Sequence, residues 1–166
     1  MALVKPAFLD TSVILAALID FGAASRAPRA LFDAIAARRL GRPRTAWHCC
    51  LELYSVATRL PEEFRLQPAQ ARELIESEVF GRLDVLDLSA RDRPAFLRWA
   101  SARSVVGGRL YDAHIAQIAR ISRSAVVITD NVRHFAGVAG ELRVLSSEEA
   151  VRELRSTRVT PVPDNM

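Results

Sequence analysis

Two carboxylates of this chain lie where an α/β protein would gather them around a cation. Asp10 directly follows an apolar run at residues 4–9, which predicts a buried strand. Asp112 lies at or just after the beginning of a helical pattern that runs to residue 121. In open sheets of parallel strands, the strand ends and the helices that follow them border one crevice. We therefore expect Asp10 and Asp112 to converge there.

Two further polar positions are candidates for the same crevice. Asp130 and Asn131 follow the β-branched run at residues 125–129, which predicts a strand buried on both faces. Glu52 lies on a predicted helix over residues 47–60, in a largely apolar stretch. An unpaired carboxylate in apolar surroundings would cost on the order of several kcal/mol or would take up a proton. A cation shared with the other carboxylates removes that cost.

Carboxylate oxygens in this arrangement are the ligands that hard cations such as Mg²⁺ or Mn²⁺ prefer. A cation of this kind lowers the pKa of a bound water and offsets the charge that develops on a phosphorane. It also lets an anionic substrate approach a pocket of like-charged carboxylates. The pattern therefore favours metal-dependent hydrolysis of phosphodiesters.

Each candidate also has a purely structural explanation. Asp10 and Asp112 can cap the helices that follow them. Asp130 and Asn131 can form an ordinary turn, and Glu52 can pair with an arginine. The position of all four sites at one expected crevice is what favours a functional interpretation.

The composition sets broad limits on the class of protein. The chain has 166 residues, a net charge of +4 and a sequence pI of about 9.8. Basic character permits a polyanionic partner. The adjacent Cys49 and Cys50 lack the spacing of a zinc site and are poorly placed to pair, so we interpret them as buried structural residues. No apolar run is long enough to span a bilayer and no signal peptide is recognised, which favours a cytoplasmic protein with no membrane partner.

The hydrophobic pattern predicts alternating strands and helices within a single domain over residues 1–155, followed by a flexible tail at 156–166. The expected strands lie at 4–9, 83–88, 125–129 and 142–145, and the expected helices at 11–19, 25–39, 47–60, 68–78, 89–103, 112–121 and 146–155. This alternation is typical of an α/β protein with a mostly parallel sheet covered by helices on both faces.

Four segments of the chain resemble the PIN-domain nucleases and, among them, the VapC-type toxins of bacterial VapBC toxin–antitoxin pairs. In the family's order they are FLDTSVILA with Asp10 and Thr11, ELYSVATRLP with Glu52, GGRLYDAHIAQIA with Asp112, and VITDNVRHF with Thr129, Asn131 and His134. Each motif is weak alone, but the ordered set runs through most of the chain.

The resemblance implies a three-layer α/β/α PIN-like sandwich with a short, mostly parallel central sheet. It implies a Mg²⁺- or Mn²⁺-dependent endoribonuclease that acts on tRNA or rRNA, forms a homodimer and is covered by a VapB-like antitoxin. Carried over by position, Asp10, Glu52 and Asp112 hold the metal, while Thr11 and Thr129 orient carboxylates or water.

The fourth family position departs from the commoner Asp, because Asn131 occupies it here. We prefer Asn131 as the catalytic pocket residue and keep Asp130 as a substitute, since alternation along the strand directs Asp130 elsewhere. A neutral fourth residue favours one metal ion over two.

Other residues near the motifs have ordinary explanations beside functional ones. We expect a structural hydrogen bond for His134, no catalytic role for His48 or His114, and solvated side chains or phosphate contacts for Arg109 and Arg133. Stacking on bases is an alternative to helix packing for the aromatic residues Trp47, Tyr54 and Tyr111.

Alternative functions are a PIN nuclease of RNA processing or DNA cleavage, and a non-catalytic PIN scaffold that binds RNA or protein. A receiver domain is disfavoured because it needs a late lysine, and Lys5 is the only lysine. A haloacid-dehalogenase-type phosphatase is disfavoured because Ser12 stands where its second Asp belongs.

Overall fold

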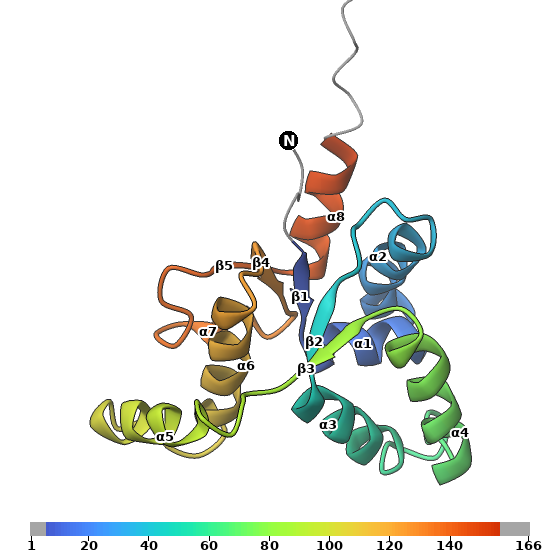
Figure 1. Cartoon of the computed structure of the whole chain (residues 1–166). Coiled ribbons are helices and arrows are strands. Elements are labelled where there is room, and N and C mark those ends of the chain that lie inside the picture. The colour runs from blue at the N-terminus through green and yellow to red at the C-terminus, as the bar shows by residue number, and fades with distance from the viewer. Residues whose placement is uncertain (1–5, 157–166) are drawn as a thin grey trace, which may run out of the picture.

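A five-stranded sheet with strand order β3-β2-β1-β4-β5 organises the computed structural model, which describes residues 6–156 (Figure 1). The strands are β1 (Ala7–Leu9), β2 (Arg44–Ala46), β3 (Asp84–Leu86), β4 (Val126–Ile128) and β5 (Arg143–Leu145). Every pairing between neighbouring strands is parallel. The predicted α/β architecture with a short parallel sheet is therefore confirmed.

The two central strands bury both of their faces. In β1, Phe8 packs into one hydrophobic cluster while Ala7 and Leu9 pack into another. In β4, Val127 and its two neighbours divide between the same clusters. Full burial of a large apolar side chain contributes roughly 1.5 to 3 kcal/mol, so short strands are held mainly by what covers them.

Helices cover the two faces as separate layers (Figure 1). One layer contains α1 (Thr11–Leu18), the 3-10 turn η1 (Gly22–Ser25), α2 (Arg26–Ala36) and α8 (Ser147–Ser156), and the other contains α5 (Arg93–Ala102), α6 (Arg109–Ile121) and α7 (Val132–Phe135). Beyond the carboxyl ends of the strands lies α3 (Trp47–Ala57). The chain continues through α4 (Pro68–Leu74) and the π-helix η2 (Ile75–Phe80), which leads to the beginning of β3 and buries Ile75 and Val79 in the same cluster as α1 and α2.

Three elements were not predicted from the sequence, namely β2, α7 and the 3-10 turn η1. Strand β2 contains Arg44, Thr45 and Ala46, which show no apolar alternation, and it is held by tertiary contacts. Thr45 is fully buried and its hydroxyl donates to the carbonyl of Leu9 at 2.8 Å. The short helix α7 occupies the segment after Asn131, where only a turn was expected.

Several predicted boundaries are wrong by a few residues. Helix α3 ends at Ala57, before the predicted end at residue 60, and α6 begins at Arg109, three residues before Asp112. Ser156, the first residue of the predicted tail, is the last residue of α8. Residues 1–5 and 157–166, which include part of the first predicted strand and the rest of the tail, lie outside the described residues.

The prediction that the two cysteines are buried agrees with the structure. Within residues 6–156, Cys49 and Cys50 are both buried and form no disulfide. Burial raises the pKa of the Cys49 thiol to about 12, which leaves it protonated and unreactive near neutral pH. No helix in the same range is long and apolar enough to cross a bilayer.

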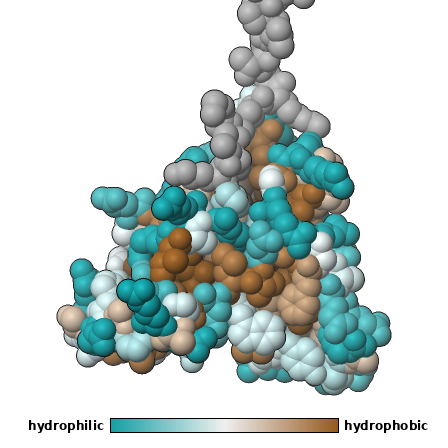
Figure 2. Space-filling view, in the orientation of Figure 1, coloured by the Kyte–Doolittle hydropathy of each residue, from teal (hydrophilic) through white to brown (hydrophobic). Residues whose placement is uncertain are grey.

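The edge of the sheet at β3 is less covered than its centre. Val85 and Leu86 are only half-buried. Figure 2 shows an apolar band across the middle of the face on which β3 lies.

Candidate active site

A cavity of about 650 Å³ opens at the carboxyl ends of β1 and β4. Its lining combines acidic and polar side chains with a basic and aromatic rim: Asp10, Thr11, Ser12, Glu52, Asp112 and Asn131, together with Arg109, Tyr111, Arg133 and His134. The structure therefore places three predicted carboxylates and Asn131 around one space, although they come from widely separated parts of the sequence.

Asp10 lies at the N-cap position of α1 but does not cap that helix. Its backbone is extended, and within the described residues its side chain makes no capping hydrogen bond to α1. One carboxylate oxygen, Oδ2, instead accepts hydrogen bonds from Thr129 Oγ1 at 2.7 Å and Ser12 Oγ at 2.9 Å. The simple capping explanation therefore does not account for this carboxylate.

The charge of Asp10 is held in an unfavourable environment. The residue is only 6% exposed. Burial raises the pKa of its carboxyl group above the ordinary value, and the charge of nearby Glu52 raises it further. The hydrogen bonds from Thr129 and Ser12 oppose this effect and only partly compensate for it.

Thr129 and Ser12 form a hydroxyl bridge between the ends of β1 and β4. Their hydroxyl oxygens lie 3.3 Å apart, and both bond Asp10. Thr129 Oγ1 also accepts the backbone N–H of Asn131 at 3.0 Å, and Ser12 Oγ accepts that of Asp130 at 3.1 Å. Ser12 was not predicted to be a site residue from the sequence. Its position two residues after Asp10 was the only available signal.

Glu52 reaches the cavity from α3, but its surroundings differ from the prediction. Its side chain is exposed, so the expectation of an apolar environment is wrong. The helix buries Cys49 and Leu53, on either side of Glu52 in sequence, and leaves Glu52 at the cavity. Thr11 Oγ1 donates to Glu52 Oε2 at 2.6 Å, which ties this carboxylate to the beginning of α1.

Asp112 lies in the first turn of α6, where Gly108 occupies the N-cap position. A capping role for Asp112 is therefore excluded by its place in the helix. Burial raises the pKa of its carboxyl group, the charges of Asp10 and Glu52 raise it further, and His134 and Arg109 lower it. Each of the three carboxylates thus lies in the electrostatic field of the others.

Asp130 and Asn131 point to different places. Asp130 Oδ1 accepts hydrogen bonds from the backbone N–H and the hydroxyl of Ser147, at 2.9 and 2.7 Å, at the beginning of α8. Asn131 is among the residues that line the cavity. Asp130 therefore contributes to holding α8, and Asn131 is available to whatever enters the cavity.

Basic side chains form part of the rim. Arg109 Nη2 donates to the carbonyl of Ala136 at 3.2 Å, which fixes the beginning of α6 against the end of α7. Arg133 and His134 come from α7 and line the same cavity. A cationic rim around an acidic floor is suited to a ligand that carries both a cation and an anion.

The donor atoms of the cavity fit a hard cation by their chemistry. They are carboxylate, hydroxyl and amide oxygens, and the mutual repulsion of Asp10, Glu52 and Asp112 is what a bound cation would relieve. Among residues 6–156, however, no three acidic, histidine or cysteine side chains lie close enough to hold a metal as they stand. Binding therefore requires a rearrangement of side chains.

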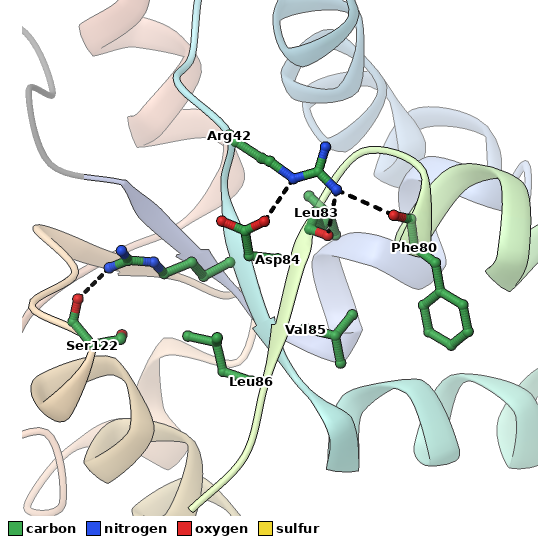
Figure 3. Close-up of a pocket in the computed structure, with 8 residues that line it drawn as sticks. Arg42, Phe80, Leu83, Asp84, Val85, Leu86 and Ser122 are labelled. Carbon is green, nitrogen blue, oxygen red and sulfur yellow. Dashed lines mark hydrogen bonds and ion pairs between the residues drawn. The ribbon is translucent and has the colours of Figure 1, made fainter.

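A second cavity, of about 550 Å³, lies at the amino ends of β2 and β3 (Figure 3). Arg42 Nε donates to Asp84 Oδ1 at 2.6 Å, and Arg42 Nη2 donates to the carbonyls of Phe80 and Leu83, each at 3.3 Å. Arg44 donates to the carbonyl of Ser122. These charges are already engaged by opposite charges or by backbone oxygens.

Known proteins share both the sequence pattern and the fold. Residues 7–141 match the family model described as PIN domain, a range that contains all the acidic residues of the cavity. The chain is 33% identical over 125 residues to Ribonuclease VapC27 of Mycobacterium tuberculosis, which covers 75% of this chain and 85% of that protein.

Solved structures with lower sequence identity have a similar fold. PAE2754 from Pyrobaculum aerophilum has a TM-score of 0.60 and 20% identity, over 92% of this chain and 90% of that chain. VapBC-1 from nontypeable Haemophilus influenzae has a TM-score of 0.57 and 21% identity, over 86% of this chain and 98% of that chain. FitAcB from Neisseria gonorrhoeae has a TM-score of 0.56 and 20% identity, over the same shares of the two chains.

Proposed function

Because the chain belongs to the PIN-domain family, among its VapC-type members, we propose that it is a metal-dependent endoribonuclease and the toxin of a toxin–antitoxin pair. The observation that carries the proposal is the convergence of Asp10, Glu52 and Asp112 in one cavity. None of the three is explained by capping a helix or by an ion pair with an arginine among the described residues.

Asp10, Asp112 and Glu52 would hold one Mg²⁺ or Mn²⁺ ion, with Asn131 at the fourth position. When bound, such an ion lowers the pKa of a water and offsets the charge that develops on the phosphate. The remaining work falls to side chains of the chain itself. Thr129 and Ser12 fix the carboxylate of Asp10, and Thr11 fixes that of Glu52. Arg109, Arg133 and His134 attract the polyanionic substrate to the rim.

RNA, with tRNA or rRNA as its source, is the proposed substrate. Support comes from the relative named as a ribonuclease and from the basic character of the chain. An activity test must distinguish cleavage of tRNA or rRNA by a toxin from three alternatives. These are DNA cleavage, a role in RNA processing, and binding without cleavage.

The proposal is tested by incubating the purified chain with total tRNA, with rRNA and with DNA. We expect cleavage of RNA in the presence of Mg²⁺ or Mn²⁺ and none after addition of EDTA. Asp10→Asn and Asp112→Asn variants should be inactive, whereas Asp33→Asn, a matched change on an exposed part of α2, should cleave like the parent chain. Unchanged cleavage by the first two variants would overturn the site assignment.

A protein partner is also proposed, namely a VapB-like antitoxin, together with a homodimeric state. Exposed apolar side chains lie on α3 and η2, where Trp47, Leu51, Tyr54 and Phe80 line a cavity of about 440 Å³. Patches of this kind mark surfaces that another protein covers. Expression of the chain in a bacterial host should arrest growth, and co-expression of the adjacent small gene should restore it. Growth unaffected by well-folded chain would contradict the toxin role.

A further inference from the structure

Two aromatic rings from different helices stack at the edge of the acidic cavity. The rings of Tyr111 in α6 and His48 in α3 are parallel within 7°, and their centroids lie 4.5 Å apart. Tyr111 directly precedes Asp112, and His48 lies one helical turn before Glu52. The pair therefore joins the two helices that carry two of the cavity's carboxylates.

Other side chains pack against His48 or support its neighbours. The ring of His114 meets His48 edge to face, with centroids 6.4 Å apart, and it packs against Phe96 at 5.4 Å. His114 Nε2 lies 3.6 Å from Asp87 Oδ1, and Arg93 bonds the other oxygen of that carboxylate at 3.3 Å. His48 is thus positioned by α6 and by the segment before α5.

The outer part of Tyr111 remains open to solvent. The residue is 54% exposed even though His48 covers one face of its ring, and it lines the acidic cavity. An exposed aromatic ring that is fixed in orientation and placed beside a phosphate-binding cavity is what single-stranded RNA recognition uses.

We propose that Tyr111, backed by His48, is a stacking platform for one unpaired RNA base adjacent to the phosphate that is cut. This inference rests on the proposed ribonuclease function and adds to it a residue that positions the substrate. Stacking uses the face that every base shares, so the platform selects an unpaired nucleotide and not a particular base.

Tyr54 provides a matched control within the same molecule. It is a tyrosine of α3 with a similar exposure, 40%, but it lines the apolar cavity between α3 and α4. A loss of binding on its substitution would indicate a general effect of surface aromatic residues. A loss confined to Tyr111 indicates the platform.

The test uses a single-stranded oligouridylate that contains one 2-aminopurine, whose fluorescence falls when the base stacks. The titration is done with Mg²⁺ in an Asp112→Asn background, so that the RNA is not cut. We expect quenching by this protein and a rise in Kd of about fivefold to a hundredfold when Tyr111 is changed to Ala, since one base stack is worth roughly that much. Tyr111→Phe should restore quenching, and Tyr111→Leu, which keeps an apolar side chain against His48, should not.

Two results would overturn the platform: quenching by Tyr111→Leu equal to that by Tyr111→Phe, or an equal loss with Tyr54→Ala. In a fully paired duplex the same 2-aminopurine is already quenched by its stacked neighbours, so its fluorescence should not change when the protein is added. Cleavage by the chain with Asp112 intact is measured separately. Cleavage with a KM that does not change in Tyr111→Leu refutes the platform and leaves the nuclease. Ring-dependent quenching without any cleavage refutes the nuclease and leaves the platform.

Discussion

Charged side chains are paired at one end of the sheet and lie beside like charges at the other. At the amino ends of β2 and β3, Arg42 meets Asp84 and backbone carbonyls, so each charge has a partner of complementary character (Figure 3). At the carboxyl ends, Asp10 and Asp112 lie in the field of each other and of Glu52, and burial raises the pKa of both. Two cavities of similar size thus differ in whether their charges are satisfied.

This contrast shows why cavity size is a poor guide to the reactive site. A paired charge on the surface contributes little to stability, about 0 to 1 kcal/mol, and offers nothing to a ligand. Buried groups of like charge that lie close together destabilise the folded protein, and such arrangements cluster at functional sites. In the cavity at the carboxyl ends, a cationic ligand would reduce the repulsion between the carboxylates of Asp10, Glu52 and Asp112.

Substitution of an acidic residue at each end should give the largest difference. Asp112→Asn is expected to lower the rate of RNA cleavage by roughly a thousandfold, since metal-borne charge stabilisation is worth several kcal/mol. Asp84→Asn should leave the rate within about twofold and cost about 1 kcal/mol or less, because its ion pair with Arg42 is exposed. Initial cleavage rates and urea denaturation measure the two effects. Equal rates for both variants would remove the distinction between the two ends.

The hydroxyl that holds Asp10 should matter next. Thr129→Val keeps the shape of the fully buried side chain but removes the hydrogen bond to Oδ2. We expect a loss of metal affinity or activity of about 10- to 100-fold, as is usual for groups that orient ligands. The measurement is the Mg²⁺ concentration that gives half-maximal cleavage. Thr45→Val, which removes a buried hydroxyl bond to the carbonyl of Leu9 outside the cavity, is the matched control.

The neighbours Asp130 and Asn131 should separate stability from activity. Asp130→Ala removes the acceptor for Ser147 and should cost about 0.5 to 2 kcal/mol, the range for lost capping interactions, with little change in cleavage. Asn131→Ala should reduce cleavage with little change in stability. Thermal denaturation and initial rates are measured on both variants. The reverse result would make Asp130 the fourth pocket residue.

The smallest expected effect is the change with pH in the free energy of unfolding of the metal-free protein. The pKa of Asp10 is higher in the folded chain than in the unfolded chain, so the folded state binds the proton more tightly. Stability should therefore fall as pH rises from the unfolded pKa through the folded pKa, and then level off. Asp112 acts in the same direction.

Asp10→Asn should reduce the loss of stability with rising pH and stabilise the metal-free protein at neutral pH by about 0.5 to 2 kcal/mol, because residues kept for function often destabilise the fold. Thermal denaturation in EDTA between pH 4 and pH 8 measures the stability of both proteins. A variant that is less stable than the parent at neutral pH would show that Asp10 is structurally favourable. Added Mg²⁺ should raise the stability of the parent more than that of the variant.

The sequence predicts those features that depend on the order of elements. Asp10 and Asn131 follow buried strands, and parallel topology alone brings such positions together. Local pattern does not reveal β2, because its three residues are held by neighbours on both sides and not by their own alternation. Nor does it reveal that Ser12 bonds Asp10, since serine after a helix start has many possible partners.

Glu52 illustrates a different limit. Its apolar neighbours in sequence suggested burial, but a helix presents different faces to the core and to the cavity, and a side chain between Leu51 and Leu53 can still reach water. Asp130 shows the same limit in reverse. Its partner, Ser147, lies 17 residues away. Ser147 is brought close to Asp130 only because β5 pairs with β4 and α8 begins just after β5.

The place of β1 in the middle of the sheet gives the three carboxylates unequal freedom. Asp10 is tied through Thr129 to the neighbouring strand, whereas Glu52 lies on α3, where Thr11 bonds it, and Asp112 lies on α6. Under the proposed nuclease function, β1 would therefore fix the position of the phosphate, and shifts of α3 or α6 would reshape the entrance around it.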